Sequence, residues 1–123
     1  MLQEERTERI IGAAIEVHRA LGPGLLESVY ENCLAHELAL RGFGVRRQVE
    51  LPVEYRGVRM ECGFRLDLLV DEVVIVEVKA IEKLLPLHEA QLMTYLKLAR
   101  VRVGLLINFN CLVLAPNIRR RVL

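Results

Sequence analysis

The sequence predicts a mixed α/β fold, with helices packed against a single sheet. Apolar residues recur at the helical period in three stretches, residues 7–21, 25–41 and 86–100. Short runs of Val, Ile and Leu, bounded by glycine, proline and acidic turns, indicate buried strands between and after these helices. The predicted order is helix, helix, three antiparallel strands, helix, strand and strand.

Length and composition limit the possible functions. A chain of 123 residues can bury one core, so residues 1–123 are expected to form a single domain. The net charge of +1 excludes a strongly basic nucleic-acid binder, and any basic surface must be local. The three cysteines form no close pair, which favours reduced thiols in a cytoplasmic protein. No signal peptide or membrane-spanning segment is expected.

The first predicted helix covers residues 7–21, with Thr7 as its expected N-cap. His18 falls within the apolar stripe of this helix. A histidine in that position is either a hydrogen-bonded core residue or a ligand, and the sequence leaves both open. Gly22-Pro23-Gly24 ends the helix.

The second predicted helix covers residues 25–41 and begins with a carboxylate next to its apolar face. Glu27 leans toward the core just after the glycine turn, as a site residue would. A glutamate favoured by the helix macrodipole at a helix start is an equally good interpretation. Glu31 is expected further round, toward solvent. Glu37 and Arg41, four residues apart, are expected to form a structural ion pair.

A hairpin is predicted from two long strands around the Arg56-Gly57 turn. The first strand covers residues 45–55 and the second residues 58–70, so a two-residue turn places Gln48 opposite Arg65. A further strand is expected over residues 73–80.

The stretch from residue 64 to residue 80 carries charges inside two apolar strands. Asp67, Glu77 and Lys79 are costly there unless they are paired or bind a metal. Glu77 and Lys79 are two residues apart and therefore share one face of their strand. Two carboxylates and an ammonium on one face could hold a divalent metal and activate water. A Glu-Lys surface pair on an edge strand is the alternative.

The register of these two strands decides whether the carboxylates meet. Pairing Val70 with Val74 leaves the three-residue connection 71–73 and sets Asp67 opposite Glu77. A two-residue turn would send the two carboxylates to opposite faces. We therefore expect a three-residue turn or a bulge at this position.

The helix over residues 86–100 is predicted to be well buried, with Gln91 and Tyr95 aimed into a packed layer where both need polar partners. Residues 103–108 are predicted to form a buried strand, followed by a short last strand at 111–114. The basic tail after these strands is expected to be a solvated terminus.

Three motifs in order resemble those of a known family. Asp67, nine further residues and then Glu77-Val78-Lys79 resemble the signature of the PD-(D/E)XK nuclease superfamily. Gln91-x-x-x-Tyr95 is similar to the extra motif of its RecB-like branch, and Gly24-Leu-Leu-Glu27-Ser-Val-Tyr30 resembles the motif of the GxxExxY protein family. The resemblance implies a restriction-endonuclease-like αβββαβ core with an extra N-terminal helix.

The resemblance also implies a divalent metal, Mg²⁺ or Mn²⁺, and a division of roles. The implied ligands are Asp67, Glu77, the backbone carbonyl of Val78, Glu27 directly or through water, and His18 from the upstream helix. Lys79 would stabilise the attacking hydroxide or the charge on the phosphate. Gln91 and Tyr95 would orient the lysine and a DNA phosphate.

Three functions are consistent with these residues. The favoured one is a metal-dependent nuclease that hydrolyses phosphodiester bonds, of DNA rather than RNA. The second is a catalytically silent module with the same fold that binds nucleic acid or a partner protein. The third is a different metal- or anion-dependent enzyme. Homodimerisation, cleavage mode and sequence preference are left open.

Overall fold

The computed structural model describes residues 1–123 and confirms the mixed α/β class. The elements, in chain order, are α1 (Gln3–Leu21), α2 (Glu27–Leu40), β1 (Val45–Glu50), β2 (Val53–Tyr55), β3 (Val58–Met60), β4 (Arg65–Val70), β5 (Val74–Lys79), α3 (Pro86–Ala99), β6 (Val103–Asn108), the 3₁₀ turn η1 (Ala115–Asn117) and β7 (Ile118–Val122). Five strands form one sheet in the order β1-β4-β5-β6-β7. Neighbours are antiparallel except for the parallel pair β5 and β6.

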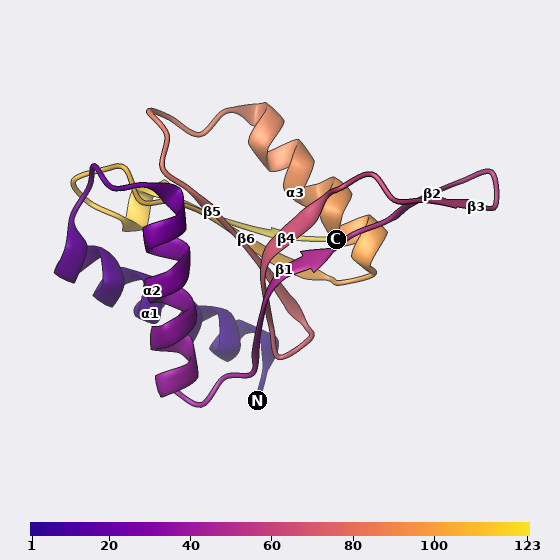
Figure 1. Ribbon diagram of the computed structural model, residues 1–123. Coiled ribbons are helices and arrows are strands. Elements are labelled where there is room, and N and C mark those ends of the chain that lie inside the picture. Colours follow the sequence, from indigo (N-terminus) through magenta and orange to yellow (C-terminus); the bar gives the residue numbers. More distant parts are fainter.

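The order α2-β1-β4-β5-α3-β6 is the expected αβββαβ core, and α1 is the extra helix before it. Helices α1 and α2 cover one face of the sheet and α3 covers the other (Figure 1). The core on the α1–α2 side contains 18 buried residues, whereas the core under α3 contains 8. The face under α3 is therefore only partly filled with apolar side chains, which leaves space for polar groups. No helix is long and apolar enough to cross a membrane.

The two long strands predicted around Arg56-Gly57 are each divided in the structure. The first breaks after Glu50, where Pro52 cannot donate to a ladder and the amide of Leu51 bonds instead to the carbonyl of Phe64 at 2.9 Å. Strands β2 and β3 form a separate two-stranded sheet, which we call the arm (residues 53–60). The arm projects from the body of the molecule (Figure 1).

The predicted turn between β4 and β5 is confirmed. Val70 pairs with Val74, and the connection has three residues. Asp71 and Glu72 adopt φ values of 52° and 60°, a region that glycine would occupy more easily. The side chain of Asp71 secures this backbone, because it accepts hydrogen bonds from the amide of Gly44 at 2.8 Å and from Arg6 at 3.2 Å.

Three expectations about the remaining elements are wrong. Helix α1 begins at Gln3, so Thr7 is not its N-cap; the Thr7 hydroxyl donates to the carbonyl of Glu4 within the helix. Helix α3 is less buried than expected, because only Leu92 and Leu96 are buried. The last strand is not residues 111–114 but β7, formed by the tail that was expected to be solvated.

The basic tail joins the sheet because its arginines find partners. Arg119 and Arg121 both pair with Glu89 on α3, and the guanidinium of Arg120 donates to the hydroxyl of Thr7. These contacts on both faces of β7 explain why a basic segment can form an edge strand.

Candidate active site

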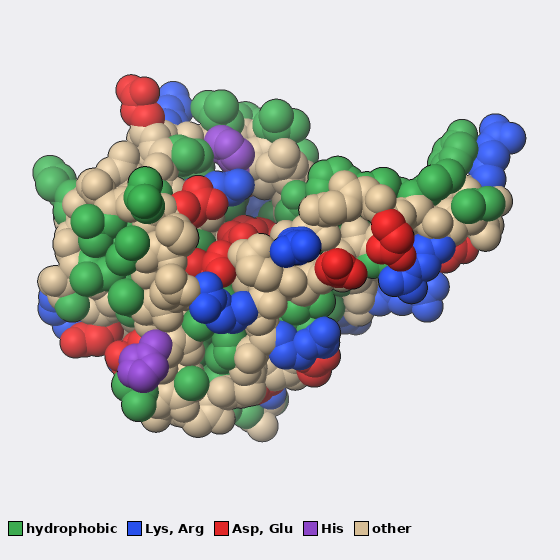
Figure 2. Space-filling view, viewed as in Figure 1, with side chains coloured by type: hydrophobic (Ala, Val, Ile, Leu, Met, Phe, Trp, Pro, Cys, Tyr) green, Lys and Arg blue, Asp and Glu red, His purple; other side chains and the backbone are tan.

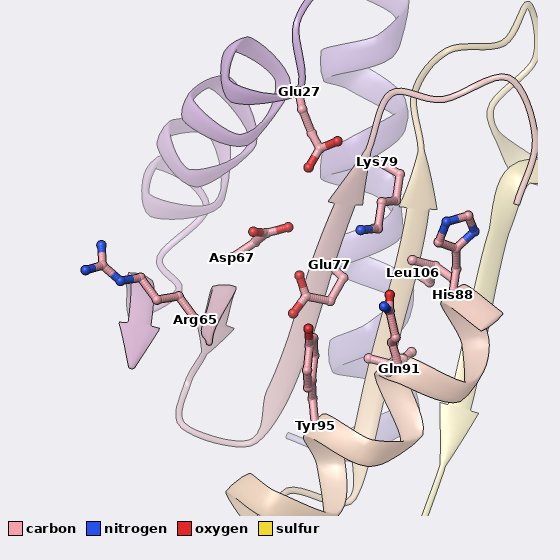
Figure 3. A pocket seen from close by; sticks show the side chains of 10 residues that line it. Glu27, Arg65, Asp67, Glu77, Lys79, His88, Gln91, Tyr95 and Leu106 are labelled. Carbon is pink, nitrogen blue, oxygen red and sulfur yellow. The ribbon is translucent and has the colours of Figure 1, made fainter. Parts of the chain in front are cut away.

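A small polar pocket lies between the edge of β4–β5, helix α3 and the start of α2 (Figure 3). Its volume is about 120 Å³, and its lining consists mainly of charged and polar side chains: Glu27, Arg65, Asp67, Glu77, Lys79, His88, Gln91, Leu92, Tyr95 and Leu106. Figure 2 shows acidic side chains at the bottom of this hollow in the molecular surface. The pocket therefore unites side chains from three separate parts of the sequence.

The two strand carboxylates lie on the same face, as the three-residue turn requires. Backbone pairing between β4 and β5 extends from Val70 and Val74 to Leu68 and Val76. Beyond that point the carboxylate of Asp67 accepts a hydrogen bond from the amide of Val78 at 2.8 Å. The Asp67 side chain thus takes the place of a backbone hydrogen bond between the two strands. This contact holds its carboxylate beside Val78 of β5.

Glu77 is the most strongly perturbed group in the protein. Its side chain is only 6% exposed, and its Oε1 atom has no hydrogen-bond partner. Burial raises the pKa of Glu77 to about 10, with a further contribution from the carboxylate of Asp67, while Lys79 acts in the opposite direction. An unsatisfied buried carboxylate is costly, and such groups cluster at functional sites.

Glu27 and Lys79 border the same space. Glu27 is the first residue of α2, and Lys79 is the last residue of β5. Burial raises the pKa of Glu27, the nearby ammonium of Lys79 lowers it, and the carboxylate of Asp67 raises it. In Figure 3 both side chains point into the gap above Asp67 and Glu77. The glycine turn before α2 is what brings this helix-start carboxylate to the sheet.

Helix α3 contributes one polar stripe to the pocket. His88, Gln91 and Tyr95 lie three and four residues apart and therefore share a helix face. The Tyr95 hydroxyl and the Gln91 amide point toward Glu77 and Lys79 (Figure 3). Burial raises the pKa of Tyr95, and the carboxylates of Glu77 and Asp67 add to this rise. His88 was missed by the sequence analysis, although its position one turn before Gln91 could have revealed it.

A network of polar side chains, with Glu31 as its one buried member, supports Asp67 from the side of β1. Glu31 is 7% exposed, not solvated as expected, and accepts hydrogen bonds from Arg47 at 2.9 Å and from Gln48 at 2.8 Å. The same Gln48 amide also reaches Asp67 at 3.5 Å. Gln48 therefore lies beside Asp67 and not opposite Arg65, and its φ of 49° is unusual for a residue other than glycine.

The family model of the PD-(D/E)XK nuclease superfamily matches residues 4–121. The chain belongs to this superfamily. The comparison with curated proteins and the comparison with solved structures each give no match. Membership covers almost the whole chain, so the superfamily's typical dependence on divalent metals can be tested against these residues.

The charged residues of the superfamily signature line the pocket, but one predicted metal ligand, His18, does not. His18 lies on the opposite side of the sheet, in the core that α1 and α2 cover. Its Nε2 atom is 2.7 Å from the carbonyl of Cys111, and its ring lies 6.4 Å from that of Phe109. This environment is that of a hydrogen-bonded core histidine, one of the two interpretations that the sequence left open.

The remaining residues fit a hard divalent cation by the chemistry of their donors. The structure has no group of three His, Cys, Asp or Glu side chains close enough to hold a metal. Asp67 and Glu77 nevertheless supply two carboxylates, and Oε1 of Glu77 lacks any other partner. Mg²⁺ usually takes only one or two carboxylates and keeps several waters. Two carboxylates with a backbone carbonyl are therefore sufficient for this ion.

Proposed function

We propose that the protein is a metal-dependent nuclease that hydrolyses phosphodiester bonds, with DNA favoured over RNA. The observation that carries this proposal is the buried Glu77 beside Asp67, whose Oε1 atom has no hydrogen-bond partner, at the position of the superfamily signature. The motifs around Glu27, Gln91 and Tyr95, which line the same pocket, support assignment to the GxxExxY family and the RecB-like branch.

The proposed metal ligands are Asp67, Glu77 and the backbone carbonyl of Val78, with Glu27 directly or through water. When bound, Mg²⁺ or Mn²⁺ would lower the pKa of a water and offset negative charge on the phosphate. His18 is left out of this set because it lies on the other side of the sheet.

The side chains around these carboxylates have separate tasks. The ammonium of Lys79 donates to the attacking oxygen or to the phosphate as negative charge develops there. Gln91, which lines the same pocket, orients the Lys79 side chain. The raised pKa of Tyr95 keeps its hydroxyl protonated, so this group donates to a phosphate oxygen. The proton on Glu77 must leave before its carboxylate can bind a cation.

Cleavage of plasmid DNA and of single-stranded oligonucleotides, with and without Mn²⁺ or Mg²⁺, tests the activity. Lys79→Ala is expected to reduce the cleavage rate by about 10²-fold or more, the scale of a lost electrostatic stabiliser. Lys83→Ala removes an exposed lysine outside the pocket and serves as the control. Equal cleavage by the parent and Lys79→Ala would contradict the proposed mechanism.

Calorimetric titration with Mn²⁺ tests the metal site independently of cleavage. Asp67→Asn and Glu77→Gln are each expected to weaken binding markedly, whereas Glu82→Gln, which neutralises an exposed glutamate, should not. Lys79→Ala should bind Mn²⁺ at least as tightly as the parent, because a nearby positive charge is removed. A double variant of Asp67 and Glu77 that binds like the parent would show that the metal lies elsewhere.

A silent module that binds nucleic acid or a partner protein is the second candidate function. Its support is the small size of the chain, 123 residues, and its near-neutral net charge of +1. This alternative predicts binding of oligonucleotides without cleavage at any divalent metal concentration. The parent protein in the plasmid assay therefore separates the two candidates.

A further inference from the structure

The arm has one apolar and one charged face. Val53 pairs with Met60 and Tyr55 with Val58, so these four side chains share one face of the two-stranded sheet. Glu54 and Arg59 form the second pair and lie on the opposite face. In Figure 2 hydrophobic side chains follow the upper edge of the arm, while most of its charged side chains lie below.

The charged face of the arm borders a groove of about 460 Å³ that it shares with the end of α3. Four cationic residues line this groove against a single carboxylate, Glu54: Arg56 and Arg59 from the arm, Lys97 from α3 and Arg100 from the C-terminal cap of α3. Arg59 is bound to Glu61 outside the groove at 2.7 Å. The other three cations have no carboxylate partner, although the chain as a whole carries a net charge of only +1. The guanidinium of Arg56, at the tip of the arm, lies 5.6 Å from the centre of the Tyr55 ring. The groove is thus a local concentration of uncompensated positive charge.

Two of these cations occupy positions where local backbone preference does not favour arginine. Arg56 has a φ of 50° at the tip of the arm, and Arg100 has a φ of 57° at the C-terminal cap of α3. Glycine and asparagine are the residues that such turns and caps prefer. An arginine at both positions disregards local propensity, and such departures are expected at functional sites.

The groove and the catalytic pocket are joined by α3. Gln91 and Tyr95 face the pocket, and Lys97 and Arg100 face the groove further along the same helix. At 1.5 Å per residue, Arg100 lies roughly 14 Å beyond Gln91 along the helix axis. One strand of a duplex carries a phosphate about every 3.4 Å of its axis, so this separation spans about four phosphates.

We propose that the groove between the arm and the end of α3 binds the phosphodiester backbone of a nucleic-acid substrate, about four phosphates away from the bond at the catalytic pocket. This inference rests on the proposed nuclease function for its substrate class. Arg56, Lys97 and Arg100 contact phosphates without reading bases, so they set the position and affinity of the strand and not its sequence. The arm is then a clamp that engages the strand at a distance from the reaction.

The test is the binding of a fluorescent oligonucleotide in EDTA, followed by anisotropy at several salt concentrations, for the single-stranded and the duplex form. The variant Arg56→Asn/Arg100→Asn removes two charges and places asparagine where the backbone favours it, so folding is preserved. We expect affinity to fall by about tenfold and the slope of log K against log salt to become shallower by about 1.4 to 1.8, since each lost contact contributes about 0.7 to 0.9. The control Arg9→Gln/Arg19→Gln removes the same charge from α1 and should change neither value.

A second variant tests the groove in the opposite direction. Glu54→Gln removes the only carboxylate that lines the groove and is expected to tighten binding and steepen the salt dependence. For oligonucleotides too short to carry four phosphates beyond the pocket, the double arginine variant should bind as tightly as the parent.

The outcomes separate this proposal from the nuclease function. If the parent binds and the double arginine variant keeps its affinity and salt slope, the groove proposal is overturned while the nuclease stands. A parent that binds but does not cleave contradicts the nuclease, and the groove is supported in that case if the double arginine variant binds more weakly with a shallower salt slope. A parent that binds no nucleic acid overturns both.

Discussion

The protein contains two hairpins that follow one another in sequence and differ in almost every physical respect. The β4–β5 hairpin lies in the middle of the sheet, where most of its side chains are buried, and it carries Asp67 and Glu77. The arm is short, isolated from the main sheet and exposed along its second strand. Burial makes the first hairpin suitable for chemistry, because desolvation is the largest cause of the raised pKa of Glu77 and the neighbouring Asp67 adds to it. Exposure makes the second suitable for salt-dependent contacts with a flexible, charged ligand.

The turns of the two hairpins match these roles. The arm uses a two-residue turn in which Arg56 and Gly57 both have positive φ, as expected for a regular hairpin. The buried hairpin uses three residues, and that extra residue brings Asp67 and Glu77 to one face. Its strained backbone at Asp71 is stabilised by contacts with Gly44 and Arg6 from outside the hairpin. Positioning the two carboxylates therefore depends on the rest of the fold, whereas the arm depends mainly on its own turn.

The largest expected effect comes from the proton that burial places on Glu77. Its pKa is about 10 in the folded protein and 4.5 as the ordinary value, so its contribution to stability is full below about pH 4.5 and is lost as the pH rises toward 10. Without metal, the free energy of unfolding should fall by up to about 1.4 kcal/mol per pH unit within this window. Glu77→Gln keeps a neutral side chain of the same shape and should remove this slope.

Thermal unfolding in chelator between pH 5.5 and 8.5 measures this difference, with the exposed Glu82→Gln as the control. Parallel pH profiles for the parent and Glu77→Gln would show that Glu77 is ionised in the folded protein. An added divalent metal should reverse this fall in stability with rising pH, since the metal binds more tightly as the proton leaves Glu77.

A matched pair of valines sharpens the comparison of the two hairpins through packing. Val76 on β5 is fully buried, whereas Val58 on the arm is 55% exposed. Val76→Ala is expected to lower the free energy of unfolding by about 2 kcal/mol, because it leaves a cavity in the core. Val58→Ala should change it by less than about 0.5 kcal/mol. Urea unfolding of the two variants measures both values, and equal losses would mean that the arm is packed against the body in solution.

Local sequence patterns predicted most of the fold because they report short-range preferences. The helices over 25–41 and 86–100 and the three-residue turn were predicted from periodicity and from the need to place Asp67 and Glu77 together. The same patterns failed where tertiary partners decide the outcome. The tail became β7 by pairing with β6, with Glu89 and Thr7 beside its arginines, and no property of the tail itself signals those partners.

The site was predictable to the extent that its residues belong to motifs. Asp67, Glu77, Lys79, Gln91 and Tyr95 were all predicted and all line one pocket. Glu31 was placed in solvent because helical periodicity does not show that Arg47 and Gln48 from β1 pack over it. His18 was predicted as a ligand through the family resemblance, and its apolar stripe could not correct this, because such a stripe does not reveal which side of a sheet it will cover.

The smallest effect concerns Gln48 on β1, the strand that precedes the arm. Its amide bridges Glu31 and Asp67, so we expect it to orient the Asp67 carboxylate for metal binding. Gln48→Gly removes the amide but also relieves a φ of 49°, so the stability of the protein should change little while Mn²⁺ affinity falls by about tenfold. Arg56→Gly relieves a similar φ of 50° on the arm and should leave Mn²⁺ affinity unchanged. Calorimetric titration of both variants, with their melting temperatures, separates positioning from backbone strain: a Gln48→Gly variant that binds Mn²⁺ like the parent would assign Gln48 a structural role only.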